Sequence, residues 1–169
     1  MRLRIHHSLG VISLVSVYAP TEASDLTVKE AFDARLESVV DQYPRRDTLL
    51  GFVDFNASTG THRDGYETCV GPPGSETVNQ NSTKFLDFAR SHGLRVAGSW
   101  FQYSQAHRWT WYSNAGGVAK EIDHVLVDGR WRMIQNCKVN RSAQFLNTDH
   151  QLVVATLKLQ LKSRRMVPS

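Results

Sequence analysis

Cysteine is scarce in this chain, and the two that occur, Cys69 and Cys137, form no CxxC pair and no cysteine–histidine spacing typical of zinc sites. We therefore expect free thiols rather than a disulfide scaffold. Long apolar runs are also absent: no stretch reaches the roughly 20 residues of a membrane span, and the first residues lead into no signal-peptide core. These absences predict an intracellular protein, nuclear or cytoplasmic, that is not secreted.

The composition is that of a globular domain. With 169 residues, of which 41% are hydrophobic, the chain is long enough to bury a sizeable core. A net charge of +4 mildly favours a polyanionic partner, although part of the excess lies near the C-terminus, where a solvated tail is the simpler interpretation. We expect one domain over residues 1–161 and a basic tail over residues 162–169.

Alternation and turn residues divide the first part of the chain into strands and a helix. Residues 11–18 are apolar and β-branched, which predicts a buried strand. Thr27 and Glu30 have the spacing of a capping box, which predicts the start of a helix that Pro44 ends. Residues 48–53 predict a second strand.

The rest of the chain is expected to hold a second helix and more strands. Residues 58–82 are rich in glycine, threonine, asparagine and proline, which predicts a long loop. A short helix over residues 82–92 would follow, with Asn81 as its N-cap and Gly93 as its stop. Further strands are expected over residues 94–100, 108–112, 122–127, 137–141 and 152–161. This pattern predicts an α+β protein, a layered α/β sandwich.

Asp54 and Asn56 follow one of the expected strands. They alternate with apolar neighbours, which predicts that both point to one side of an extended segment. A carboxylate beside a carboxamide suits phosphodiester cleavage, because the carboxylate orients or deprotonates water and the amide donates to a phosphate oxygen. The same pair is common as an Asx turn that ends a strand, and both interpretations remain open.

Two further acids stand at strand ends. Asp123 interrupts an apolar strand, where an unpaired carboxylate is costly, so an imidazole partner is expected. His150 is the candidate because it also stands at a strand edge, whereas His124 points to the opposite face, which favours packing or a place on the surface. Asp149 diverges from His150 and is the candidate ligand of a divalent ion. Hard oxygen ligands favour Mg²⁺ or Mn²⁺ over zinc.

Aromatic side chains gather around Trp109 and Trp111, close to Arg108 in the chain. Stacking on unpaired or flipped bases is one use of such a cluster. Ordinary packing in the core of a sandwich is the other use, and we favour it for both tryptophans.

Taken in chain order, these motifs resemble those of the endonuclease/exonuclease/phosphatase superfamily, which includes pancreatic deoxyribonuclease and the abasic-site endonucleases. The resemblance extends over about residues 3–160. The matching segments are residues 17–20 (VYAP), 53–57 (VDFNA), 79–82 (NQNS), 110–111 (TW), 122–126 (IDHVL) and 148–150 (TDH). The resemblance implies a deoxyribonuclease-like β-sandwich flanked by helices.

Within the superfamily, residues 47–50 (DTLL) and 93–96 (GLRV) look most like the endonuclease domain of non-LTR retrotransposons and of craniofacial-development-protein-2-like proteins derived from them. That resemblance implies DNA as the partner. It also implies a reverse transcriptase domain in a parent element, with the basic tail as the start of the connector.

The resemblance further implies a divalent-metal-dependent endonuclease with assigned residues. Asp54 would position or activate the attacking water, and Asn56 would stabilise the transition state. Asp123 would orient His150, which would contact the phosphate or serve as acid or base. The other implied site residues are Asp149 as a ligand of Mg²⁺ or Mn²⁺, Tyr18 and Thr110 as hydrogen-bonding groups around the phosphate, and Asn79, Asn81 and Trp111 in substrate binding.

Two departures from the family pattern bear on activity. The family domain opens with a strand bearing Asn and a strand bearing Glu, the principal metal ligand. We expect this N-terminal part to be missing, so that the ion is weakly held and the remaining sheet exposes an apolar face or rearranges. Val53 stands where the family has glycine, and it either displaces Asp54 or merely extends the strand.

Three functions therefore remain open. The first is a retrotransposon-type DNA endonuclease impaired by the loss of that Glu. The second is an inactive remnant that binds nucleic acid or protein, and the third is a phosphatase of the same superfamily that acts on a small phosphorylated molecule.

Overall fold

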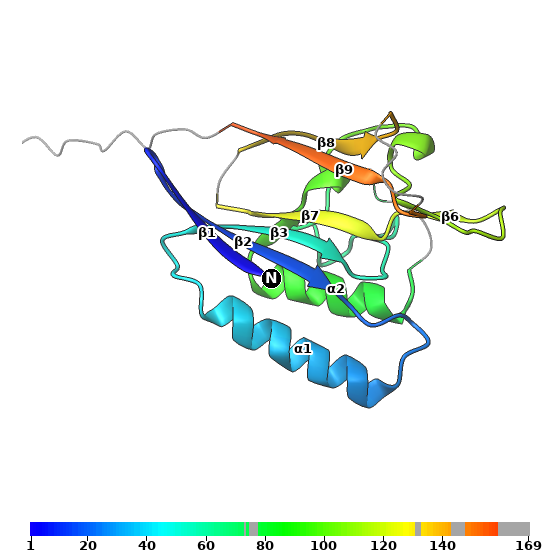
Figure 1. The fold of residues 1–169 in the computed structure, drawn as a ribbon, viewed down its shortest axis with the longest axis horizontal. Coiled ribbons are helices and arrows are strands. Elements are labelled where there is room, and N and C mark those ends of the chain that lie inside the picture. The colour runs from blue at the N-terminus through cyan, green and yellow to red at the C-terminus, as the bar shows by residue number, and fades with distance from the viewer. Residues whose placement is uncertain (73, 75–77, 131–132, 143–147, 159–169) are drawn as a thin grey trace, which may run out of the picture.

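A five-stranded mixed sheet runs through the centre of the molecule in the order β1–β2–β3–β7–β4 (Figure 1). The computed structural model describes residues 1–72, 74, 78–130, 133–142 and 148–158. The strands of the large sheet are β1 (Arg2–His7), β2 (Gly10–Tyr18), β3 (Thr48–Asp54), β7 (Asp123–Asp128) and β4 (Leu94–Val96). Only β2 and β3 pair in parallel, because the helix between them carries the chain back across the sheet.

Two helices, α1 (Leu26–Asp41) and α2 (Gln80–Ser91), cover one face of this sheet (Figure 1). The apolar residues of α2 fall on one side of the helix, and Phe85 and Ala89 are completely buried. They belong to one core cluster with Val53 of β3 and Leu126 of β7. This cluster holds α2 against β3 and β7.

A second, smaller sheet covers part of the other face. It consists of β8 (Ile134–Asn140) and β9 (Leu152–Leu157), which pair in antiparallel fashion. Alternate residues of β9 point inward, and Val153 and Leu157 pack with Leu50 and Val125 of the large sheet. The predicted α+β sandwich flanked by helices is therefore confirmed.

Short elements connect the two sheets. The 3₁₀ helices η1 (Ala97–Trp100) and η2 (Gln105–His107) follow β4 and contact β8. The small hairpin of β5 (Trp111–Tyr112) and β6 (Ala119–Lys120) extends from one end of the molecule (Figure 1). Within the described part of the chain, no helix is both long and apolar enough to cross a membrane.

The helix starts differ from the predictions. α1 begins after Asp25 with no side-chain cap, so the predicted capping box of Thr27 and Glu30 is wrong. α2 begins after Asn79 rather than after Asn81, because the Asn79 side chain accepts the Ser82 amide while the Ser82 hydroxyl accepts the Asn79 amide.

Several strands also differ in extent. The predicted strand over residues 94–100 ends at Val96, where η1 begins, and the one expected over residues 108–112 is reduced to β5. The last strand ends at Leu157, and residues 159–169, with the predicted basic tail, lie outside the described residues. Strand β1 was not predicted at all. Its Arg4 pairs with Asp47 at 2.8 Å, which ties the edge of the sheet to the loop before β3.

Candidate active site

The chain brings two aspartates together where two strands meet. Asp54 ends β3 and Asp123 begins β7, and the antiparallel register places them directly opposite each other. Residues opposite each other in a sheet project to the same face, so both carboxylates stand on one side. His150 reaches the same place from just before β9, where its backbone pairs with Trp111.

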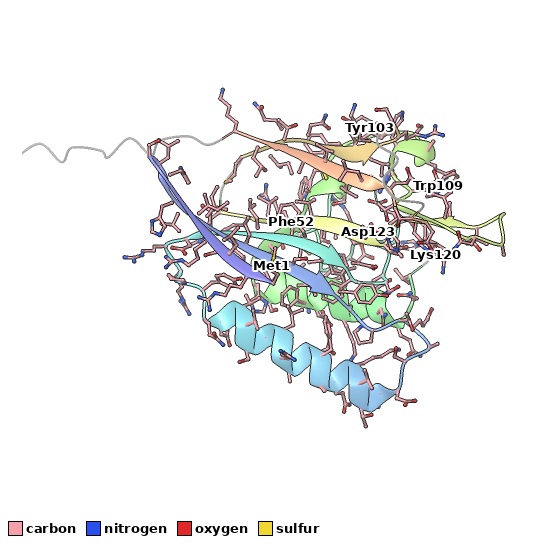
Figure 2. The ribbon with its side chains drawn as sticks, viewed as in Figure 1. Met1, Phe52, Tyr103, Trp109, Lys120 and Asp123 are labelled. Carbon is pink, nitrogen blue, oxygen red and sulfur yellow. The ribbon has the colours of Figure 1, made fainter. Side chains whose placement is uncertain are left out.

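One ligand atom from each of Asp54, Asp123 and His150 lies within 4.8 Å of the others. The sequence predicted an imidazole partner for Asp123, with His150 as the candidate, and the structure places these two side chains together. Asp123 is labelled in Figure 2, at the end of the molecule from which the β5–β6 hairpin extends. We call Asp54, Asp123 and His150 the acidic–imidazole cluster.

Asp123 orients His150. Nδ1 of His150 lies 2.9 Å from Oδ2 of Asp123, and both side chains are about one-quarter to one-third exposed (24% and 34%). An ionised carboxylate only accepts hydrogen bonds, so the proton of this bond belongs to Nδ1. Nε2 of the imidazole is therefore not engaged by Asp123.

Asp54 has a raised pKa. Burial of the carboxyl group is the largest cause, and the negative charge of Asp123 adds to it, while the Asn56 amide bond acts in the opposite direction. A higher pKa makes the Asp54 carboxylate a stronger proton acceptor than an ordinary surface aspartate.

Asn56 does not continue an extended segment. Its φ is 50°, in the left-handed region, and its amide N–H donates to Oδ1 of Asp54 at 2.9 Å. This is the Asx turn that the sequence left open, and the prediction that Asp54 and Asn56 point to the same side of an extended strand is wrong. The Asn56 side-chain amide donates to the Ala19 carbonyl at 2.9 Å, so it holds the loop after β2 against the end of β3.

Tyr18 and Thr110 occupy contrasting environments. Tyr18 pairs with Asp54 at the end of β2 and its side chain is 72% exposed. The Thr110 hydroxyl is buried and accepts the backbone amides of Ile122 and Asp123, each at 3.0 Å. Tyr18 is therefore open to a ligand, whereas Thr110 fixes the start of β7.

Asp149 lies outside the acidic–imidazole cluster. Its Oδ2 accepts the indole N–H of Trp111 at 2.8 Å, and its carbonyl accepts the amide of Tyr112. Trp111 thus orients the predicted metal ligand, a role that the sequence did not suggest. Spacing along the chain gives no signal for this contact, because 38 residues separate the two side chains.

Asn79 and Asn81 join α2 to the loops of the site. The Asn79 amide donates to the Asn56 carbonyl at 3.0 Å, and the buried Asn81 amide donates to the Pro20 carbonyl at 3.0 Å. Both side chains are thus engaged in protein contacts, while their predicted part in substrate binding stays a prediction.

His124 and Val53 lie behind the site. His124 is buried, stacks on Phe85 with ring centroids 4.7 Å apart, and contacts the Ala57 carbonyl through Nε2 at 2.7 Å, which confirms its predicted packing role. Val53 is buried in the helix-facing core. Since Val53 stands in the regular pairing of β3, the structure favours the interpretation that it extends the strand.

Solved structures share this fold. One is the endonuclease domain of TRAS1, a telomere-specific non-LTR retrotransposon, with a TM-score of 0.61 and 13% identity. Another is the 3′ phosphatase NExo from Neisseria bound to a product DNA hairpin, with a TM-score of 0.65 and 18% identity. Each match covers 94% of this chain, and they cover 63% and 65% of the solved chains. The chain therefore has the fold of the endonuclease/exonuclease/phosphatase superfamily, as its motifs predicted.

Two curated proteins are similar to this chain in sequence. Craniofacial development protein 2 of Tragulus javanicus is 27% identical over 152 residues, and that of Bos taurus is 26% identical over 152 residues. Both matches cover 89% of this chain, which spans only about a quarter of the length of these relatives (26% and 25%). The predicted similarity to this group is confirmed. No protein-family model matches the chain.

Proposed function

We propose that this chain carries the phosphate-cleaving site of a divalent-metal-dependent DNA endonuclease of retrotransposon type. The observation that supports the proposal most is the convergence of Asp54, Asp123 and His150 within 4.8 Å, with His150 oriented by Asp123. A base, an oriented imidazole and a site for a cation are the groups that hydrolysis of a phosphodiester requires.

In this proposal the residues act on one bound phosphate. Asp54 takes a proton from the attacking water, which its raised pKa favours. His150 presents Nε2 to a phosphate oxygen, and the exposed Tyr18 hydroxyl donates to another. The side-chain amide of Asn56 has two hydrogens. One is donated to the Ala19 carbonyl, and the other is left for the phosphate.

The donor set fits a divalent cation only in part. The carboxylates of Asp54 and Asp123 match the oxygen ligands of Mn²⁺, and also those of Mg²⁺ when water completes the coordination. His150 adds no ligand in this proposal, because Nδ1 is bonded to Asp123 and Nε2 serves the phosphate. Asp149 lies outside the cluster, and its proposed part as a ligand would fall to Oδ1, because the indole of Trp111 engages Oδ2. A bound ion would stabilise the charge that develops on the phosphate oxygens. So few protein oxygens predict weak binding.

DNA is the proposed substrate. NExo is described as bound to a DNA hairpin and TRAS1 as a retrotransposon endonuclease, and the net charge of +4 suits a polyanion. A reverse transcriptase domain in a parent element belongs to the same proposal. NExo, a 3′ phosphatase, favours phosphomonoester cleavage as a second candidate.

Nicking of supercoiled plasmid with Mg²⁺ or Mn²⁺ tests the proposal. His150→Ala and Asp123→Asn should each reduce the rate by about 10²- to 10⁴-fold. Asp64→Asn is the matched control, since Asp64 is an exposed loop residue away from the cluster. Equal background in wild type and all variants would reject the enzyme and leave the inactive binding remnant. Phosphate release from a 3′-phosphorylated oligonucleotide without nicking would select the phosphatase.

A further inference from the structure

The large sheet has an apolar area that the small sheet leaves open. Four of its side chains are strongly exposed: Met1 (87%), Leu3 (48%), Ile5 (42%) and Phe52 (46%). We call these four side chains the open face. Met1 and Phe52 are labelled in Figure 2. The largest apolar patch of a protein is often functional, which makes the open face a candidate contact surface.

The strand register places the open face on the side of the sandwich core. Leu3 pairs with Leu14 and Phe52 pairs with Val125, and Leu14 and Val125 both pack in the cluster under the small sheet. No residue of β1 belongs to either core cluster of the described residues. Among the described residues, the small sheet therefore stops above β2, and β1 has no covering layer on this side of the large sheet.

Two strand edges border this area. β1 has a neighbour only at β2, and β9 has a neighbour only at β8, among the strands that the structure describes. β8 contacts η1 and η2, which follow β4, so β8 lies toward the β4 edge of the molecule and β9 toward the β1 edge. One edge is thus free in each layer, on the same side of the sandwich.

We propose that a second copy of this chain covers the open face, an inference independent of the proposed function. In this arrangement the β1–β2 hairpins of the two copies pack face to face across a twofold axis. The partner's β1 continues the layer of the small sheet beside β9, and the first copy's β1 does the same for the partner. Each copy thus places two strands over the open face of the other, and the free edges of β1 and β9 become paired.

The size of the open face agrees with a modest dimer. The four exposed side chains amount to on the order of 400 Å² of apolar surface in each copy. Adding the strand edges brings the interface to the lower end of specific complexes, roughly 600 Å² per copy. A hairpin from a different protein would pair with β9 but leave the backbone groups at the edge of β1 unpaired. A second copy of this chain pairs both edges, and it is therefore the better occupant.

Sedimentation velocity over about 1 to 100 µM tests the dimer. The 19.1 kDa chain should approach twice its mass at the upper concentrations. Leu3→Lys and Phe52→Lys should each weaken association at least about tenfold, because a lysine would be desolvated at the contact. Val118→Lys is the matched control: Val118 is 49% exposed at the β5–β6 hairpin and should leave association unchanged. A monomer at every concentration, heterogeneous aggregates without a dimer, or an equal effect of Val118→Lys would overturn the proposal.

Cross-linking tests the arrangement. His6 and Val154 point away from the sandwich core on β1 and β9, and both are exposed. A mixture of His6→Cys and Val154→Cys chains should give a mixed disulfide dimer, while neither variant alone should, because β1 lies beside β9 and not beside itself. The native Cys69 and Cys137 are buried and serve as an internal background. A dimer by mass without this mixed product would overturn the edge pairing.

Discussion

Burial and a neighbouring carboxylate oppose ionisation of Asp54, and this has a consequence for stability. The pKa of Asp54 is raised in the folded chain, so the folded state holds a proton that the unfolded state releases. Stability associated with this group is therefore complete below the ordinary pKa and is lost as the pH rises through the raised value.

Asp54→Asn should accordingly be more stable than wild type at pH 7, since the amide stays neutral and still accepts the Asn56 amide bond. The difference should disappear below about pH 3, where an aspartate is protonated in both states. Urea unfolding at a series of pH values measures it. A constant difference across that range would show that the substitution acts through packing rather than ionisation.

Thr110 offers a second test at the level of one side chain. Thr110→Val keeps the shape but removes the acceptor of the Ile122 and Asp123 amides, so two buried N–H groups lose their partner. Unfolding should become easier by about 2 kcal/mol or more, and nicking should fall because Asp123 shifts. Thr110→Ser retains the hydroxyl and should recover most of both losses. Equal behaviour of the valine and serine variants would contradict this positioning role.

The sequence predicted some of these residue roles and missed others for a physical reason. Alternation along a strand indicates where Asp123 points, and a buried carboxylate needs a partner such as His150. Alternation fails at Asn56, because a single left-handed residue reverses the chain locally. The hydrogen bond between Trp111 and Asp149 was also not predicted, because it joins segments that are distant in the chain and meet only in the folded protein.

Helix α2 connects the fold to the site through its first residue. Asn79 caps the helix through its side-chain oxygen and holds the Asn56 carbonyl through its amide. Asn79→Ala should therefore destabilise the chain by about 1 to 2 kcal/mol. Gln80→Ala, an exposed neighbour, is the matched control for urea unfolding. If the two variants unfold at the same urea concentration, the capping box contributes nothing measurable.

Element boundaries were predictable where a strong pattern occurs. Apolar β-branched runs marked β2, β3 and β7, whose ends carry Tyr18, Asp54 and Asp123. β1 was not predicted although Leu3 and Ile5 alternate with basic residues, because the strand is short and has only these two apolar residues. α1 begins without a side-chain cap, so local capping signals misplaced its start.

At the scale of the whole molecule, motif order predicted the superfamily fold, while the sequence alone gave no distances between strand ends. The predicted exposed apolar face is present on β1 and β3. It follows from one sheet being wider than the other, a relation that requires both sheets to be assembled. The pairing register of β2, β3 and β7 brings Tyr18, Asp54 and Asp123 side by side, where the acidic–imidazole cluster forms.

The central claim is that Asp54, Asp123 and His150 form one phosphate-cleaving site whose two carboxylates hold a divalent cation, and Mn²⁺ binding followed by electron paramagnetic resonance tests it most directly. Wild type should bind one ion weakly, and Asp54→Asn and Asp123→Asn should each reduce the affinity by about 10-fold or more, while Asp64→Asn leaves it unchanged. Wild-type affinity in both cluster variants would contradict the account.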